Sequence, residues 1–185
     1  MKLTTLLTAA VLAFTATMPC FAQHHHCGKG CPENAPAQKS QEPPKVYFIK
    51  EITPESLIRI YKALGLPADG KVAVKISTGE KGNPNYLKPE LIGDFVKLVD
   101  GTIVECNTAY KGKRYYNNDH REVIKEHGFP SIAPVIIMDS VADVKIPVGP
   151  KAKHLKYDLV GEAFNDYDFL ICLSHFKGHQ TGGQS

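Results

Sequence analysis

The feature that most constrains this chain of 185 residues is a regular alternation between strand-like and helix-like segments. Residues Lys71–Ser77 place Val72, Val74 and Ile76 on one side, as a half-buried strand does. Pro89 then opens a segment whose apolar residues recur at helical spacing. Strands that alternate with helices of this length predict an α/β fold, a mainly parallel sheet with helices on its faces.

Further segments follow the same rule. Thr53 is a suitable cap for a helix that starts at Pro54 and ends at Gly65. Asn118 can cap another helix, which runs to His127. Strands or shorter extended pieces are expected over residues 45–49, 102–106, 134–138, 144–148, 155–160 and 167–173, with a helical turn over 161–165.

The amino terminus has the pattern of an export signal. Lys2 provides a positive charge, residues 3–17 are mostly apolar, and a small-residue cleavage site ends at Ala22. We expect a signal peptide over residues 1–22 and a periplasmic or secreted protein. A retained membrane anchor and acylation at Cys20 stay open as alternatives.

Residues 23–44 lack periodic apolar positions and are rich in His, Gly, Pro, Gln and Lys, which predicts a flexible tether before a single domain over 45–185. The tether carries imidazoles and thiols that suit Zn or Cu: His24, His25, His26, Cys27 and Cys31. A non-catalytic metal carrier is therefore one function class to test. The spacing fits neither a haem attachment site nor the four cysteines of an iron–sulfur cluster, and a plain disordered tether is the simpler interpretation.

The charge balance argues against nucleic acid as a partner. The formal net charge is +3 and includes Lys2, so removal of the signal peptide leaves little excess charge. No other segment is long and apolar enough to suggest a stable membrane span after cleavage. Of the remaining cysteines, Cys106 and Cys172 each come late in an expected strand, where a buried thiol, a bridge or a ligand are all open.

The last expected strand leads into a loop with His175, Lys177 and His179, and Gly178 lets a ligand approach the backbone closely. Ligands of open α/β sheets bind beyond the carboxyl ends of the strands, where this loop is expected. Histidine and lysine together suit an anionic group or a proton-transfer step. These three side chains are the candidate catalytic or contact residues, against the simpler interpretation of a solvated loop.

Two more loops follow strands and carry polar or basic side chains. One contains Asn107, Lys111 and Arg114, and an arginine there can hold an anion through two hydrogen bonds. The other contributes Lys75, Thr78 and Glu80. If the loops meet, Lys75, Lys111, Arg114 and Lys177 would form one positive rim, with Glu80, Glu105 or Asp139 supplying a carboxylate.

At this point the chain resembles the family known as domain of unknown function 362. The resemblance rests on residues 71–76 with their glycine-rich sequel, the Pro89 helix, the strand into residues 105–108, and residues 168–172 leading to Lys177-Gly178-His179. It covers roughly residues 46–183, and the lysine-x-histidine is its most specific element. A distant similarity to the amino-terminal domain of nickel-dependent lactate racemases is a likeness of fold and proves no activity.

The resemblance implies an α/β domain that is often associated with ferredoxin-type segments, and hence a suspected redox role with a redox partner. This chain carries no four-cysteine motif of its own, which makes an iron–sulfur cluster doubtful here. Relatives continue past the lysine-x-histidine loop, so we expect a chain truncated after it.

The leading hypothesis is an exported domain that binds a small anionic molecule or a metal cofactor at its strand ends, with its reaction, if any, open. The metal carrier and an incomplete, inactive domain are its rivals.

Overall fold

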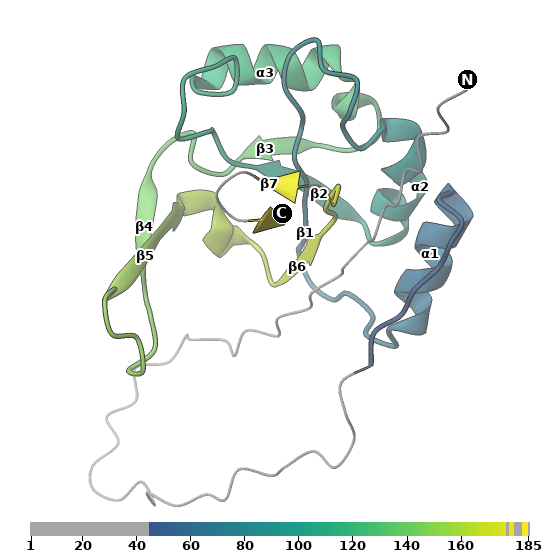
Figure 1. Ribbon diagram of the computed structural model, residues 1–185, viewed down its shortest axis with the longest axis horizontal. Helices are drawn as coiled ribbons and strands as arrows, with labels where there is room; N and C mark the ends of the chain where they lie inside the picture. Colours follow the sequence, from purple (N-terminus) through teal and green to yellow (C-terminus); the bar gives the residue numbers. More distant parts are fainter. Residues whose placement is uncertain (1–44, 177, 180–182, 185) are drawn as a thin grey trace, which may run out of the picture.

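The computed structural model describes residues 45–176, 178–179 and 183–184. Its central element is a four-stranded sheet with the order β3-β2-β1-β6. The strands are β1 (Val72–Lys75), β2 (Gly101–Glu105), β3 (Val135–Ile137) and β6 (Phe169–Cys172). Every neighbouring pair in it is parallel, so all four carboxyl ends lie along the same edge. This arrangement, shown in Figure 1, confirms the predicted α/β fold with a parallel sheet.

The alternation within each strand separates the two faces of the sheet. Val72, Val74 and Ile76 belong to the larger core cluster, together with side chains of the helices. Ala73, between them, belongs to a second and smaller cluster with Val104. The opposite directions of successive side chains in a strand therefore produce both cores, as the sequence pattern predicts.

Two helices pack together over the larger core. Helix α1 (Pro54–Ala63) begins at Thr53, whose side chain accepts a hydrogen bond from the backbone N–H of Ser56. Helix α2 (Pro89–Leu98) connects β1 to β2. The rings of Tyr61 and Phe95 meet edge to face, with centroids 5.2 Å apart, which fixes the contact between the two helices.

Helix α3 (Asn117–Glu126) and the short helix η1 (Phe129–Ser131) connect β2 to β3. The predicted cap at Asn118 is wrong, because the cap position lies two residues earlier, at Tyr116, which makes no side-chain hydrogen bond there. The Asn117 side chain is instead occupied by bonds to neighbouring loops. Tertiary hydrogen bonding thus displaces the start that the local sequence favours.

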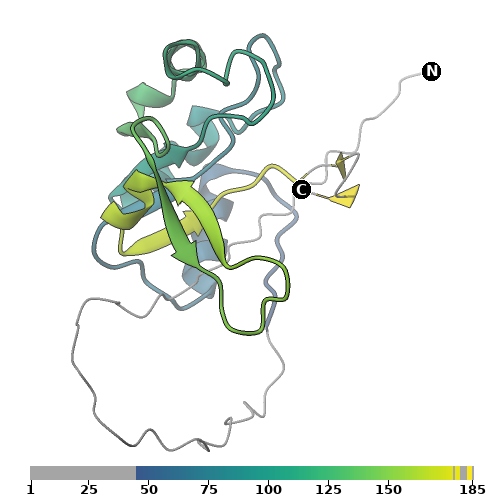
Figure 2. The ribbon, with the colours of Figure 1, turned by 90° about the vertical axis from the view of Figure 1, so that its left-hand side faces the viewer.

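A hairpin and a helical turn lie on the other side of the sheet (Figure 2). Strands β4 (Asp143–Pro147) and β5 (Tyr157–Gly161) pair with each other, antiparallel, and form a sheet of their own. The turn η2 (Glu162–Asp166) then leads into β6 and packs Ala163 and Phe164 against the smaller core. Near the carboxyl terminus, β7 (Gly178–His179) pairs with β8 (Gly183–Gln184).

The strand predicted over residues 45–49 is wrong. The segment takes no regular structure, and Val46 and Phe48 remain 82% and 71% exposed. Its run of apolar residues has no partner strand among the described residues, and a strand needs one to satisfy its backbone groups. In the described part of the chain, no helix combines the length and hydropathy required to cross a bilayer.

Candidate functional site

The candidate site lies at the carboxyl edge of the parallel sheet. From β1 the chain proceeds to β2 and then β3 on one side, whereas β6 lies on the other side of β1. The strand order therefore reverses between β1 and β6, and such a reversal is where ligands bind in open α/β sheets. The two strand ends stay in contact, because the backbone N–H of Leu173 donates to the carbonyl of Lys75 at 2.8 Å.

The carboxylate of Glu105 joins the loops after β1 and β2. Its Oε1 accepts from Lys75 Nζ at 2.9 Å and from the backbone N–H of Cys106 at 3.1 Å. Its Oε2 accepts from the backbone N–H of Thr78 at 2.8 Å and lies 3.5 Å from Arg114 Nη1. Glu105 is 4% exposed, so this buried charge is compensated by two cations and two backbone donors.

Arg114 extends the same network away from the sheet. Its guanidinium donates from Nε to Glu80 Oε1 at 3.0 Å and from Nη2 to the Tyr110 hydroxyl at 2.9 Å, and Tyr110 donates in turn to Glu80 at 2.8 Å. Burial works to lower the pKa of Arg114, but the bonds to Glu80 and the nearby carboxylates raise it above its ordinary value. Partial burial works to raise the pKa of Glu80, and the bonds from Arg114 and Tyr110 lower it overall. Arg114 is therefore a permanently charged brace between the loops.

A chain of side-chain hydrogen bonds links the β2 loop to helix α3 and the β1 loop. Asn117 Nδ2 donates to the carbonyl of Ser140 at 2.9 Å, which leaves Asn117 Oδ1 to accept from Asn107 Nδ2 at 2.7 Å. Asn107 Oδ1 then faces His120 Nδ1 at 3.1 Å, so that nitrogen carries the proton. His120 Nε2 is left as an acceptor for the Thr78 hydroxyl at 2.9 Å. The backbone carbonyl of Ser140 thus orients this series of hydrogen bonds and fixes the tautomer of His120.

The imidazole of His120 is neutral within this series of hydrogen bonds. Burial lowers its pKa below the ordinary value, against the opposing effect of the Glu105 carboxylate. Both His120 and Thr78 are 0% exposed. Although a hydroxyl, an imidazole and an amide in series resemble a nucleophile with its base, a substrate has no access to them, so they hold the loops in place.

The histidine that follows the last residue of α3 fixes the other side of the β1 loop. His127 Nδ1 donates to the carbonyl of Thr78 at 2.7 Å, and the ring stacks on Tyr86 with centroids 3.9 Å apart. Lys88 Nζ lies 3.6 Å from the centroid of the same tyrosine ring. Gly79 turns the loop with a φ of +83°, where a side chain would also strike Tyr86. Thr78 is therefore held through its N–H, its carbonyl and its hydroxyl.

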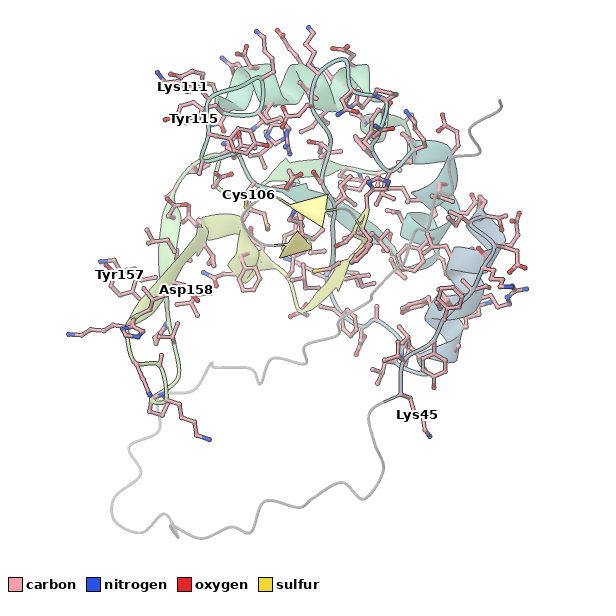
Figure 3. The ribbon with its side chains drawn as sticks, in the orientation of Figure 1. Lys45, Cys106, Lys111, Tyr115, Tyr157 and Asp158 are labelled. Carbon is pink, nitrogen blue, oxygen red and sulfur yellow. The ribbon has the colours of Figure 1, made fainter. Side chains whose placement is uncertain are left out.

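The structure brings together five of the six predicted ligand-binding residues: Lys75, Thr78, Glu80, Asn107 and Arg114. They bond to one another through Glu105 and His120. Lys111 differs, because it lies exposed at the outer part of the loop after β2 and points away from the molecule (Figure 3). The cations at Lys75 and Arg114 are already paired with carboxylates.

The residues after β6 are placed differently. His175 is partly buried three residues beyond the last residue of β6 and makes no side-chain hydrogen bond within the described part of the chain. Lys177 lies outside the described residues, and for His179 only the backbone is described, in β7. The predicted metal ligands of the tether (His24, His25, His26, Cys27 and Cys31) also lie outside the described residues.

Neither strand-end cysteine is bridged. Cys106 and Cys172 are both free and partly buried. Burial raises the pKa of Cys106 to about 11, and the carboxylates of Asp139 and Glu105 act in the same direction. The thiol is therefore protonated near neutral pH and is a poor nucleophile. Within the described ranges, no group of three or more His, Cys, Asp or Glu side chains is arranged to hold a metal ion.

The sequence reasoning missed His120, Asn117 and His127. A signal for the two histidines was present in the helix, because His120, Val123, Ile124 and His127 recur at helical spacing and all four are buried. A stripe of this kind marks the core-facing side of a helix, so its polar members need internal partners. For Asn117 the sequence offers no comparable signal, since its partners come from distant loops.

Comparisons with known proteins identify the family but no individual relative. The family model described as Domain of unknown function (DUF362) matches residues 72–185. No curated protein and no solved structure matches the chain. The match begins at β1 and includes all four strands of the parallel sheet, together with every loop of the candidate site. The chain therefore belongs to the family of domain of unknown function 362.

Proposed function

We propose that this domain binds a small anionic ligand at the carboxyl edge of the sheet, in the crevice between β1 and β6. The contacts come from His175 and Lys177, with backbone N–H groups of the loop after β6. The observation that carries the proposal is the position of this loop, which starts beside the end of β1 at the point where the strand order reverses.

The paired charges on the other side of the crevice support a division of roles. Lys75 and Arg114 bond to Glu105 and Glu80, so they shape the wall of the crevice and do not serve as free anion contacts. A wall that is bonded before the ligand arrives loses little conformational entropy on binding. His175, which makes no side-chain hydrogen bond within the described residues, is then left for the ligand, and the sequence adds Lys177 beside it.

The chemistry of these groups favours an anion. An imidazole N–H and a lysine ammonium both donate hydrogen bonds to anionic oxygens, and lysine adds a positive charge. Gly178 lets the backbone approach a carboxylate or phosphate closely. A proton transfer to or from a bound acid is the reaction that these groups could assist. The redox role suspected for the family stays a prediction.

Isothermal titration calorimetry with inorganic phosphate and with acetate tests the proposal on the full chain. The variant His175→Ala, Lys177→Ala is expected to weaken binding of the better anion at least about tenfold, because each lost contact is a charge-assisted hydrogen bond. The matched control Lys62→Ala, Lys97→Ala removes exposed cations of α1 and α2 and should leave the affinity within about twofold. Equal affinity in the site variant and the wild type would rule out the loop after β6.

We further propose that the chain is exported and that cleavage follows Ala22. The support is the charged start, the short apolar stretch and the small residues at the expected cleavage position. Mass spectrometry of the protein from its native cell should give a mature chain that begins at Gln23, and a chain that retains Met1 would contradict cleavage.

Metal binding by the tether is a second candidate function, because imidazoles and thiols are concentrated over residues 24–31. Titration of a peptide over residues 23–33 with Zn²⁺ and Cu²⁺ tests it. Micromolar binding supports a carrier, and no binding at micromolar metal rejects it.

A further inference from the structure

A surface groove lies beside helix α3, and its lining includes no residue of the loops after β1 and β6. It has a volume of about 540 Å³ and lies between helix α3 and the segment that leads through η1 into β3. Figure 1 shows α3 above β3, the outermost strand on that side of the sheet. The floor of the groove ends at Val135, the first residue of β3. The groove therefore lies near the amino edge of the sheet. Its volume falls within the range of about 300–1,000 Å³ typical of small-molecule sites.

The floor of the groove is apolar and stiff. Ile124 of α3 is 4% exposed and forms one side. Pro130, Ala133, Pro134 and Val135 form the other. The two prolines fix their own φ angles and offer no N–H group. A ligand with an apolar body would therefore meet a surface that needs little rearrangement.

Two cations of α3 line the same groove. Arg121 and Lys125 lie four residues apart, so they share one side of the helix. Both are exposed, and neither has an ion pair or hydrogen bond within the described part of the chain. Other cations near this helix do have partners: Lys113 lies 3.5 Å from Asp119, and Lys81 lies 3.5 Å from Glu126.

The helix dipole explains only one of the two charges. Lys125 is in the last turn, where a cation stabilises the helix end. Arg121 lies in the middle of α3, beyond the reach of that effect. Two unpaired positive charges beside an apolar floor have the charge and polarity that complement an organic anion.

We propose that this groove binds a small amphiphilic anion, an aromatic or aliphatic carboxylate or sulfonate. Its apolar body lies on Ile124 and Val135, and its charged group lies between Arg121 and Lys125. This site shares no residue with the proposed anion site at the ends of β1 and β6.

Fluorescence titration of the full chain with two probes of similar shape tests the proposal. The first probe, 8-anilinonaphthalene-1-sulfonate, carries a sulfonate, and the second, N-phenyl-1-naphthylamine, is uncharged. We expect the wild type to bind the sulfonate more tightly. The double variant Arg121→Gln, Lys125→Gln should weaken sulfonate binding about fivefold, which corresponds to about 1 kcal/mol for the two exposed ion pairs together. Binding of the neutral probe should change less than about twofold.

The matched control is Lys62→Gln, Lys97→Gln, which lowers the net charge equally and leaves the groove intact. Its sulfonate affinity should equal that of the wild type. A second variant, Ser131→Trp, places a large side chain at the rim of the groove and should weaken both probes. No binding of the sulfonate, or equal losses in the groove variant and the charge control, would overturn the proposal. So would undiminished binding of both probes by Ser131→Trp.

Discussion

The loops after β1 and β2 differ from the segment after β6 in how completely their polar side chains are bonded. Around Glu105 and His120, charged and polar groups bond to one another across two loops and a helix. After β6, the side chain of His175 has no such partner within the described residues. Equivalent positions on one sheet edge thus differ, since the loops after β1 and β2 are bonded to each other, whereas the imidazole of His175 makes no hydrogen bond within the described residues.

The difference also separates stability from binding. Substitutions in the braced loops should lower the free energy of unfolding, because they leave buried polar groups without partners. Substitutions after β6 should change ligand affinity and leave stability nearly intact. The predictions below test this contrast, beginning with the largest effect.

Glu105→Gln should cost the most stability. The change removes a buried carboxylate from Lys75 and Arg114 and leaves part of a positive charge uncompensated, which costs about 3–5 kcal/mol for buried pairs. Urea unfolding measures the loss. The control Glu122→Gln alters an exposed glutamate of α3 and should change stability by less than about 0.5 kcal/mol. Similar urea midpoints for the two variants would contradict the stabilising role of Glu105 between the loops after β1 and β2.

Thr78→Val tests the series of buried hydrogen bonds that passes through His120. Valine keeps the shape but removes the hydroxyl that His120 Nε2 accepts, so a buried acceptor loses its donor at a cost of about 1–3 kcal/mol. Thr108→Val is the control, since the Thr108 hydroxyl donates to the carbonyl of Tyr110 in an exposed turn. Equal and small losses in both variants would contradict the proposed role of the buried chain.

The tautomer of His120 gives a spectroscopic test of the same hydrogen bonds. A long-range ¹H–¹⁵N correlation spectrum near neutral pH should show a protonated Nδ1 and an unprotonated Nε2. The opposite tautomer would mean that the Asn107 and Asn117 amides are oriented the other way round.

A moderate dependence of stability on pH should follow from His120. Its pKa is lowered in the folded state, so the unfolded chain takes up a proton at a higher pH than the folded chain does. The contribution of neutral His120 to the free energy of unfolding is fully present above the ordinary histidine pKa of about 6.5. It is lost as the pH falls towards the pKa of His120 in the folded protein. Urea unfolding at several pH values should show a steeper acid loss for the wild type than for His120→Gln. Parallel curves would contradict the assignment.

His175→Ala should have the smallest effect on stability, below about 0.5 kcal/mol, because the side chain has no hydrogen bond to lose within the described residues. Thermal unfolding checks this. A loss comparable to that of Thr78→Val would mean that the segment after β6 is also braced, and the contrast between the two regions would fail.

The sequence predicted the sheet well because its information is local. Val72, Val74 and Ile76 specify a strand by alternation, and Thr53 with Pro54 specifies a helix start. The segment at residues 45–49 misled the prediction, because its short apolar run is an equally local signal but finds no partner strand among the described residues. Local pattern thus gives element type, and tertiary pairing decides whether the element forms.

The site was predicted in part for the same reason. Loops at strand ends follow from topology, so Lys75 and Arg114 were correctly placed near one another. Their pairing with Glu105 depends on which side chains are buried, and the sequence named this glutamate only as one of three carboxylates. Helical spacing carried a signal for the burial of His120, but its bonding partners and those of Asn117 come from other segments, which spacing does not encode.

Mapping of anion binding on the backbone tests the central proposal most directly. A ¹H–¹⁵N correlation spectrum of the full chain is recorded while inorganic phosphate is added at constant ionic strength. Binding in the crevice predicts saturable shifts at Ser77, Ser174, His175 and Phe176, at the ends of β1 and β6. No saturable shifts there, or shifts confined to Arg121, Lys125 and the groove beside α3, would contradict an anion site at the carboxyl edge.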